Sequence, residues 1–193
     1  LGTAYMQGLQ DGGVLACAKH FPGHGDTDAD SHKTLPIIQH TKERLDSIDL
    51  VPFKQMFQSG LGSIMVAHLY IPELDNTENL ASTLSSKIVS GLLKEELGFK
   101  GLIFTDALNM KGVSKFYEPG EVDVKALLAG NDVLLFAEDV PKAIEKIKEA
   151  ITKKQISQDE VDIRCKKILL AKKWFRLDKP SLVEETDLFK DLT

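Results

Sequence analysis

The chain contains one short stretch with an unusual density of side chains that can transfer protons or bind ligands. Three histidines and three aspartates lie among glycines and a proline in KHFPGHGDTDADSH, residues 19–32. Glycine lets a backbone approach a ligand closely, and loops on a rigid scaffold often carry binding and catalytic groups. We therefore predict a functional loop here. The alternative is that Asp26 and Asp30 only form local Asx-turns and that the histidines are incidental.

A metal site is a second interpretation of the same stretch. Its three aspartates fall at the first, third and fifth positions of a calcium loop, but Ser31 stands where glycine is needed and Ile37 where the bidentate glutamate belongs. These two departures argue against calcium. Zinc ligation by His24 and His32 stays open because both ligand types suit zinc, although their spacing matches no recognised zinc pattern.

Two further candidates follow apolar runs. Asp106 comes directly after the run at 102–105. A carboxylate there is either a nucleophile or base facing a cleft, or an N-cap for the segment that follows. His68 follows the run at 63–67, where a core histidine with satisfied hydrogen bonds is the plainer interpretation.

These candidates need elements that bring them together, and the sequence predicts alternating strands and helices. Four apolar runs predict strands at 14–18, 63–67, 102–105 and 133–137. Segments of helical period predict helices at 42–58, 85–97, 122–128, 141–154 and 158–175, with a glycine after the third and the capping box of Ser157 and Glu160 at the last. This alternation indicates an α/β fold with a parallel sheet.

The positions of the candidate residues favour a barrel over an open sheet. Lys19 and His20, His68, and Asp106 each follow a different predicted strand, and a (β/α)8 barrel builds its active site from such strand ends. Four units are half of eight. We therefore predict that residues 1–178 form the second half of a TIM-type (β/α)8 barrel whose other half lies upstream, and that 179–193 are a linker or the start of a following region.

Composition excludes several classes of function. The 193 residues carry a formal net charge of −5 without a basic patch, so nucleic acid is not expected as a partner. No apolar stretch approaches the ~20 residues that span a bilayer, so no membrane-spanning segment is expected. The only two cysteines, Cys17 and Cys165, form neither a disulfide framework nor a paired metal motif, and we expect plain core or helix positions for them.

Two segments together resemble glycoside hydrolase family 3. KHFPGHG at 19–25, continuing to Asp30-Ser31-His32, resembles the signature of the β-N-acetylglucosaminidase branch of that family. LLKEELGFKGLIFTD at 92–106 resembles the stretch that ends in the family's nucleophilic aspartate. KILLAK at 167–172 is similar to the helix that closes the family's barrel. The resemblance extends from about Leu1 to Asp178.

The resemblance implies a role for each candidate. Asp106 is the nucleophile, His32 is the acid/base and is oriented by Asp30, and Lys19 and His20 bind sugar hydroxyls. A retaining glycosidase needs such a carboxylate, and an imidazole with a reference pKa of ~6.5 can give and take a proton near neutral pH. The remaining strand-end histidine, His68, is expected to line the barrel mouth and contact substrate.

The implied activity is that of a retaining exo-glycosidase that removes terminal β-linked N-acetylglucosamine, from peptidoglycan fragments, without a cofactor or a metal. The bacterial compartment stays open between cytoplasm, periplasm and secretion. Without the upstream half, where the family holds an arginine and an aspartate for the sugar, we expect the chain alone to be inactive. The cut edges of a half-barrel also predict self-association, as a homodimer, unless 181–193 cover one edge.

Two alternatives to this function remain. One is a metal-dependent hydrolase that uses His24, Asp30 and His32. The other is a carbohydrate-binding remnant without catalysis, because a fold does not by itself secure an activity.

Overall fold

The computed structural model describes residues 1–25, 27 and 35–179. The predicted catalytic residues Asp30 and His32 and the predicted linker beyond residue 179 lie outside this described part of the chain.

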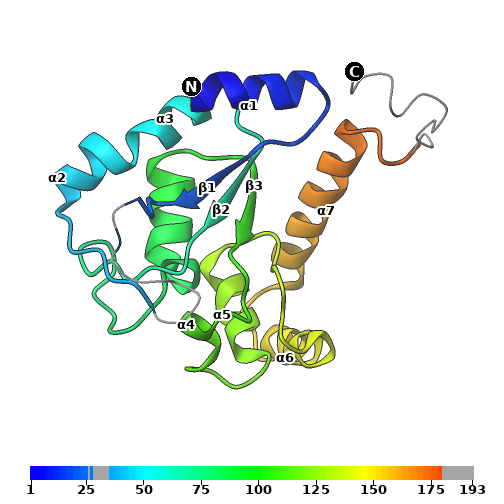
Figure 1. Cartoon of the computed structure of the whole chain (residues 1–193). Helices are drawn as coiled ribbons and strands as arrows, with labels where there is room; N and C mark the ends of the chain where they lie inside the picture. The colour runs from blue at the N-terminus through cyan, green and yellow to red at the C-terminus, as the bar shows by residue number, and fades with distance from the viewer. Residues whose placement is uncertain (26, 28–34, 180–193) are drawn as a thin grey trace, which may run out of the picture.

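A small parallel sheet forms the centre of the molecule (Figure 1). Its strands β1 (Cys17–Phe21), β2 (Ser63–Val66) and β3 (Leu102–Thr105) pair in the order β1-β2-β3, and both pairs are parallel. This confirms the predicted α/β class with parallel strands. The predicted strand at 102–105 is confirmed at both ends, and the one at 63–67 ends one residue earlier than expected.

The first strand lies further along the chain than the prediction of 14–18. Pairing with β2 places Cys17 opposite Ser63 and Phe21 opposite Val66. The backbone N–H of Ala67 donates to the carbonyl oxygen of Phe21 at 2.9 Å, so the ladder continues to that residue. Two of the predicted functional residues are therefore inside β1 and do not follow it.

The predicted fourth strand at 133–137 is wrong. Val133 forms only an isolated parallel bridge with Phe104, and its carbonyl oxygen accepts a hydrogen bond from the Thr105 N–H at 3.0 Å. Two residues on, the Leu135 N–H donates to the Thr105 hydroxyl at 2.9 Å and not to a backbone carbonyl. Phe136 then adopts a φ of 50°, which is uncommon for a residue with a side chain and turns the backbone away from the sheet.

The helices follow the predicted order, with additions. They are α1 (Gly2–Asp11), α2 (Lys42–Arg44), the π-helical segment η1 (Leu45–Asp49), α3 (Val51–Gln58), the 3₁₀ turn η2 (Ser82–Leu84), the π-helical segment η3 (Lys87–Glu96), α4 (Lys111–Ser114), α5 (Glu121–Ala129), α6 (Val140–Thr152) and α7 (Gln158–Trp174). The predicted helix at 42–58 is thus three consecutive segments. Gly130, with a φ of 116°, ends α5, and the capping box of Ser157 and Glu160 begins α7, as predicted. In the described part of the chain, no helix is both long and apolar enough to cross a membrane.

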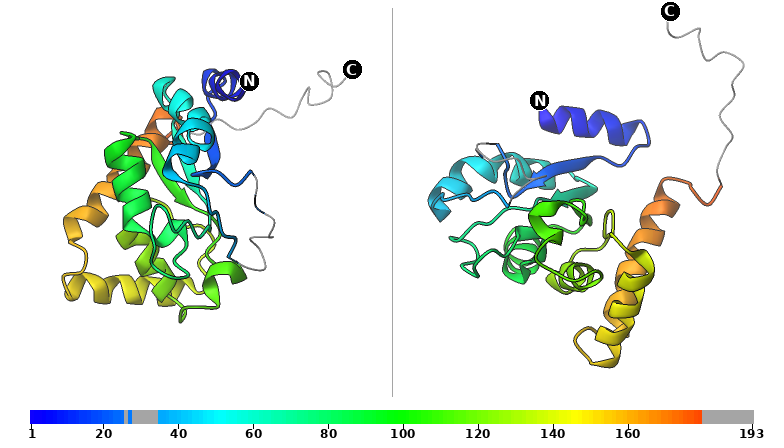
Figure 2. Two further views of the ribbon diagram at one scale, coloured as in Figure 1. Left: turned by 90° about the vertical axis from the view of Figure 1, so that its left-hand side faces the viewer. Right: turned by 60° about the horizontal axis from the view of Figure 1, so that its bottom comes forward.

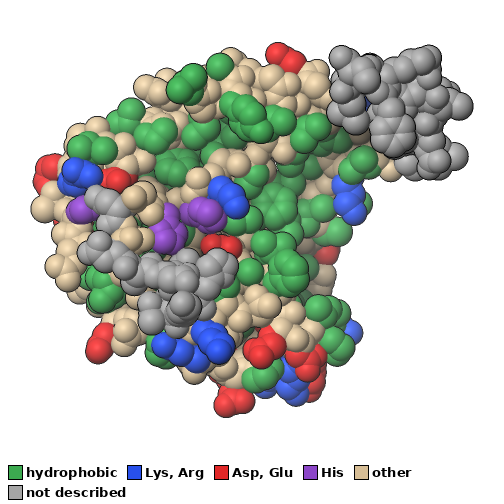
Figure 3. Space-filling view, viewed as in Figure 1, with side chains coloured by type: hydrophobic (Ala, Val, Ile, Leu, Met, Phe, Trp, Pro, Cys, Tyr) green, Lys and Arg blue, Asp and Glu red, His purple; other side chains and the backbone are tan. Residues whose placement is uncertain are grey.

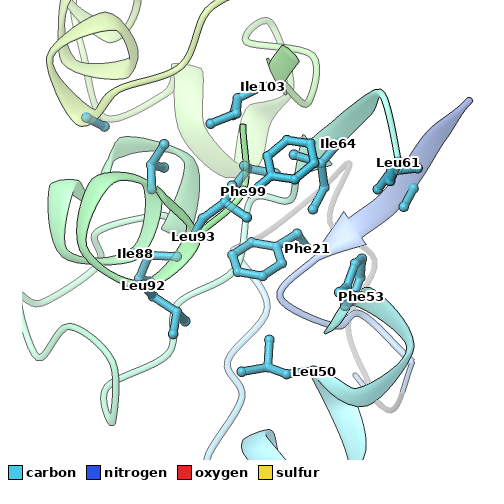
Figure 4. Close-up of a cluster of buried hydrophobic side chains, with 14 of the residues drawn as sticks. Phe21, Leu50, Phe53, Leu61, Ile64, Ile88, Leu92, Leu93, Phe99 and Ile103 are labelled. Atoms are coloured by element: carbon cyan, nitrogen blue, oxygen red, sulfur yellow. The ribbon is translucent and has the colours of Figure 1, made fainter. Parts of the chain in front are cut away.

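The largest core cluster among the described residues packs α1, α3 and η3 against one face of the sheet. Figure 4 shows the side chains that α3 and η3 contribute to it. Ala18, Ile64 and Ile103 are neighbours across the three strands, and all three side chains are buried on this face. The segment η3 contributes four buried apolar residues, Ile88, Val89, Leu92 and Leu93.

The residues in between, on the opposite face of the sheet, are less covered. Cys17 is exposed, and Met65 and Phe104 are half-buried. The expectation of a core position for Cys17 is therefore wrong, whereas Cys165 is an exposed residue of α7. Ser63 and Leu102, which lie in the same row as Cys17, are buried, so this opposite face is covered at some positions and open at others.

Candidate active site

The described candidate residues lie at the carboxyl ends of three neighbouring strands. Lys19 and His20 belong to β1, His68 lies two residues beyond β2, and Asp106 directly follows β3. Since the strands are parallel and adjacent, their ends meet at one edge of the sheet (Figure 1). Figure 3 shows histidine, lysine and acidic side chains close together on one face of the molecule, beside a large apolar area.

His20 and Asp106 face each other across this edge. The imidazole Nε2 of His20 lies 3.8 Å from Oδ2 of Asp106, and the two side chains are 29% and 16% exposed. They therefore form an ion pair when the imidazole is protonated, and both remain accessible to a ligand. The ring of His24 lies edge-on to that of His20, with centroids 5.9 Å apart, and its Nδ1 is 2.9 Å from the hydroxyl oxygen of Thr27.

The two oxygens of the Asp106 carboxylate have different surroundings. Oδ1 accepts a hydrogen bond from the Ala107 N–H at 2.8 Å, while Oδ2 is the atom directed at His20. The backbone N–H of Asp106 donates to the carbonyl oxygen of Val66 at 2.9 Å and so ties the residue to β2. Asp106 is not an N-cap, because the next helix, α4, has Met110 at that position. One oxygen of the carboxylate is thus bound to the backbone, and the other faces His20.

His68 lies beneath this edge and not at its surface. Its side chain has no exposed area, its Nδ1 is 2.8 Å from the hydroxyl oxygen of Thr83, and its Nε2 is 3.0 Å from the carbonyl oxygen of Ala107. Burial lowers the pKa of the imidazole. Because both ring nitrogens have protein partners, this geometry favours the plainer interpretation of a core histidine with satisfied hydrogen bonds over the predicted contact with substrate.

Sequence patterns did not reveal Thr83 and Asn131, which are both fully buried; Thr83 contacts the His68 ring, and Asn131 contacts Thr83. The side-chain amide of Asn131 donates to the carbonyl oxygens of Thr83 at 2.9 Å and Ala126 at 2.7 Å. Thr83 belongs to the short turn η2, which has no periodicity from which a prediction could start. Buried polar residues of this kind are recognised only from their partners.

The metal interpretation cannot be placed on the described residues. Between Leu1 and Lys179, apart from positions 26 and 28–34, no group of three or more histidine, cysteine or acidic side chains is arranged to hold a metal ion. Two of the three proposed ligands, Asp30 and His32, lie outside the described residues.

Cationic, imidazole and carboxylate groups thus lie at neighbouring ends of a parallel sheet. This arrangement is typical of α/β proteins whose active site lies at the carboxyl ends of the strands. The family model described as the glycosyl hydrolase family 3 N-terminal domain matches residues 1–171 of this chain. The chain belongs to glycosyl hydrolase family 3, and the resemblance identified from its two motifs is confirmed.

Similar proteins carry consistent names. A β-hexosaminidase A of Pseudoalteromonas piscicida is 40% identical over 145 residues, which are 70% of this chain and 24% of that protein. A β-hexosaminidase of Nitrosospira multiformis is 40% identical over 147 residues, covering 76% of this chain and 41% of that protein.

The fold agrees with these relatives. The structure of a family 3 β-N-acetylglucosaminidase from Paenibacillus sp. str. FPU-7 superposes with a TM-score of 0.91 at 39% identity, over 97% of this chain and 36% of that chain. This chain therefore spans between about a quarter and two fifths of the length of these relatives.

Proposed function

We propose that this chain carries the nucleophile and the acid/base of a retaining exo-β-N-acetylglucosaminidase. The observation that carries the proposal is the Asp106 carboxylate, which sits at the end of β3 with Oδ1 bound to the Ala107 N–H and Oδ2 turned toward His20. A nucleophile needs one oxygen presented to the anomeric carbon and little freedom to turn away from it. The names of the relatives support the sugar, N-acetylglucosamine.

Two displacement steps follow from these roles. In the first, Oδ2 of Asp106 forms a bond to the anomeric carbon while the bond to the leaving oxygen breaks, and that oxygen takes a proton from the imidazolium of His32. In the second, neutral His32 removes a proton from water, the water oxygen attacks the anomeric carbon, and Asp106 leaves as a carboxylate. His32 and its orienting partner Asp30 are proposed from the family resemblance.

Lys19 and His20 are proposed to bind the hydroxyl groups of the sugar. Both lie in β1. The neighbouring strand β2 ends two residues before His68, and β3, on the far side of β2, ends directly before Asp106. The 3.8 Å between His20 Nε2 and Asp106 Oδ2 is longer than a good hydrogen bond, so a bound sugar can take up the interaction of either group. Peptidoglycan fragments are the proposed source of the sugar.

We further propose that residues 1–178 supply the second half of a (β/α)8 barrel, that the first half comes from upstream sequence, and that 179–193 lead to a following region. The limited share of the relatives' length that the chain spans supports this division. The chain alone is then inactive and associates with itself through the open edges of its half-barrel, most simply as a two-fold dimer.

The test of the function is Asp106→Asn in the full-length protein, assayed with 4-nitrophenyl N-acetyl-β-glucosaminide. We expect turnover to be abolished and inhibition by N-acetylglucosamine to persist, because the substitution removes the attacking charge and keeps the volume. Asp11→Asn is the matched control, because this aspartate is exposed on α1. Substantial turnover by Asp106→Asn would exclude the nucleophile role.

Two additional assays separate the alternatives. Activity that persists in a chelator excludes the metal-dependent hydrolase with the His24, Asp30 and His32 ligands. Wild-type protein that binds N-acetylglucosamine but turns over no substrate would instead establish the non-catalytic remnant.

A further inference from the structure

The peptide group that follows the Asp106–Ala107 bond is held from both sides. Its carbonyl oxygen, that of Ala107, accepts a hydrogen bond from Nε2 of His68 at 3.0 Å. Its N–H, that of Leu108, donates to the carbonyl oxygen of Leu135 at 2.9 Å. The Ala107 carbonyl also accepts from the Met110 N–H at 3.1 Å, so this peptide plane cannot rotate without breaking at least one of three hydrogen bonds.

The proton positions around His68 can be deduced from its partners. The Ala107 carbonyl can only accept, so Nε2 must carry a proton. The Thr83 hydroxyl has one proton, and two acceptors compete for it, the carbonyl oxygen of Ala67 at 2.5 Å and Nδ1 of His68 at 2.8 Å. Burial lowers the pKa of His68 and so favours the neutral ring, in which Nδ1 is an acceptor.

Thr83 is itself fixed. Its carbonyl oxygen accepts from the side-chain amide of Asn131, which holds Ala126 with its second N–H. The side chains of His68, Thr83 and Asn131 have no exposed area, so none of these bonds competes with water. A buried polar network of this kind rigidifies its surroundings, although Oδ1 of Asn131 has no hydrogen-bond partner among the described residues.

We propose that His68, oriented by Thr83, is a positioning residue that aims the carboxylate of Asp106. Ala107 links the two, because its N–H holds Oδ1 of Asp106 and its carbonyl is held by His68. Without the imidazole, the bonds to Met110 and Leu135 remain, but the peptide that follows Ala107 has one restraint fewer. The Ala107 N–H then holds Oδ1 less firmly, and Oδ2 keeps its place opposite His20 less strictly. This inference rests on the proposed function, because it explains how the proposed nucleophile is held.

The experiment uses the full-length protein and three substitutions. His68→Leu removes both hydrogen bonds at similar volume, whereas His68→Gln retains a side-chain amide that can reach the Ala107 carbonyl. Thr83→Val removes the orienting hydroxyl without a change of shape. With 4-nitrophenyl N-acetyl-β-glucosaminide, we expect kcat to fall about 10- to 100-fold in His68→Leu, less in Thr83→Val, and to be largely restored in His68→Gln.

Ligand binding should not weaken in parallel with kcat. We expect KM and inhibition by N-acetylglucosamine to stay within about twofold of wild type, because His68 does not touch the ligand. An unchanged kcat in His68→Leu would overturn the proposal. So would a loss of kcat that parallels a loss of thermal stability and is not restored by glutamine, because the role would then be only structural.

Two measurements keep the proposal testable when an assay fails. If His68→Leu does not fold, Thr83→Val against Thr83→Ser decides, and equal kcat values for these two overturn the proposal. A crystal structure of a His68 variant is independent of activity, and an Asp106 carboxylate unmoved from the Ala107 N–H would also overturn it. Failure of the proposed function is distinct, because there Asp106→Asn would turn over substrate as wild type does.

Discussion

Two helical segments of similar hydrophobic content, η3 and α7, show opposite relations to the core. In η3, Ile88, Val89, Leu92 and Leu93 are buried against the sheet (Figure 4). In the 17-residue α7, no residue is buried, although the helix contains isoleucine, leucine and tryptophan. The segment α7 lies at the side of the molecule opposite to α2 (Figures 1 and 2).

The two segments are held by different interactions. Apolar packing holds η3, whereas α7 is attached largely by polar side chains, with Val161 packed against the small cluster of Leu127, Ala150 and Ile156. Arg164 donates to the carbonyl oxygens of Asn131 at 3.1 Å and Leu127 at 3.2 Å, and Lys167 forms an ion pair with Asp132. The capping box at Ser157 sets the start of α7. Caps and polar contacts can therefore define a helix whose apolar side chains remain uncovered.

The largest effect that the comparison predicts is in η3. Leu93→Ala removes a side chain with no exposed area from the main cluster and should lower the free energy of unfolding by about 2–5 kcal/mol. The same substitution at Leu170 of α7, which is 57% exposed, should change it by less than about 0.5 kcal/mol. Chemical denaturation of this chain measures both values. Equal losses at the two positions would contradict the difference in burial.

A smaller effect on the free energy of unfolding is predicted for a buried carboxylate of α5. Asp123 of α5 is 1% exposed, and neither of its oxygens has a hydrogen-bond partner among the described residues. Burial, with a contribution from Glu138, raises its pKa. The folded state therefore holds this proton more tightly than the unfolded state does. The stability contribution falls as the pH rises from the ordinary value of 3.8 through the raised pKa, and is constant above it.

The asparagine side chain of Asp123→Asn cannot ionise. The free energy of unfolding of this variant should therefore lack this decline with rising pH. We expect the stability of the variant relative to wild type to rise between pH 4 and the raised pKa of Asp123, and to stay constant above it. Denaturation curves across this range measure the difference, in which the other titrating groups cancel. Asp11→Asn, at an exposed position, should give a flat difference. A flat difference for Asp123→Asn would show that its carboxylate is not disfavoured by burial.

The sequence predicted the elements where local pattern and tertiary pairing agree. The strand at 102–105 is apolar and lies between β2 and the Val133 bridge, so its bounds follow from its composition. The segment 133–137, which was predicted as a strand, is similarly apolar. There, however, the Thr105 hydroxyl replaces a backbone partner at Leu135, and the positive φ of Phe136 ends the pairing. Composition does not contain that information.

The residues of the candidate site also differ in how far their roles could be predicted from sequence. Lys19, His20 and Asp106 could be named from sequence because their motifs are reactive and follow or end apolar strands. The role of His68 could not, because its residue type fits a ligand contact and a buried hydrogen-bonding role equally well. Only its partners, Thr83 and Ala107, distinguish the two.

The smallest expected effect on folding concerns the uncovered side chains of α7. Ile163, Leu170 and Trp174 follow each other at steps of seven and four residues, which places them along one side of α7. All three are more than half exposed. Such a stripe with heptad-like spacing is typical of a helix that packs against a partner.

Leu170→Lys tests whether this stripe has a partner. In a chain that stays monomeric, we expect a change in unfolding free energy of at most about 0.5 kcal/mol, because the side chain is already in water. Light scattering of the wild-type chain should show self-association that Leu170→Lys weakens, if copies of the chain cover the stripe. In the full-length protein, the same substitution should cost several times more, about 2 kcal/mol or above, if the upstream half-barrel covers it. A negligible cost in the full-length protein, together with a monomeric wild-type chain, would mean that α7 is uncovered in both, and the contrast with η3 would then be a permanent property of the fold.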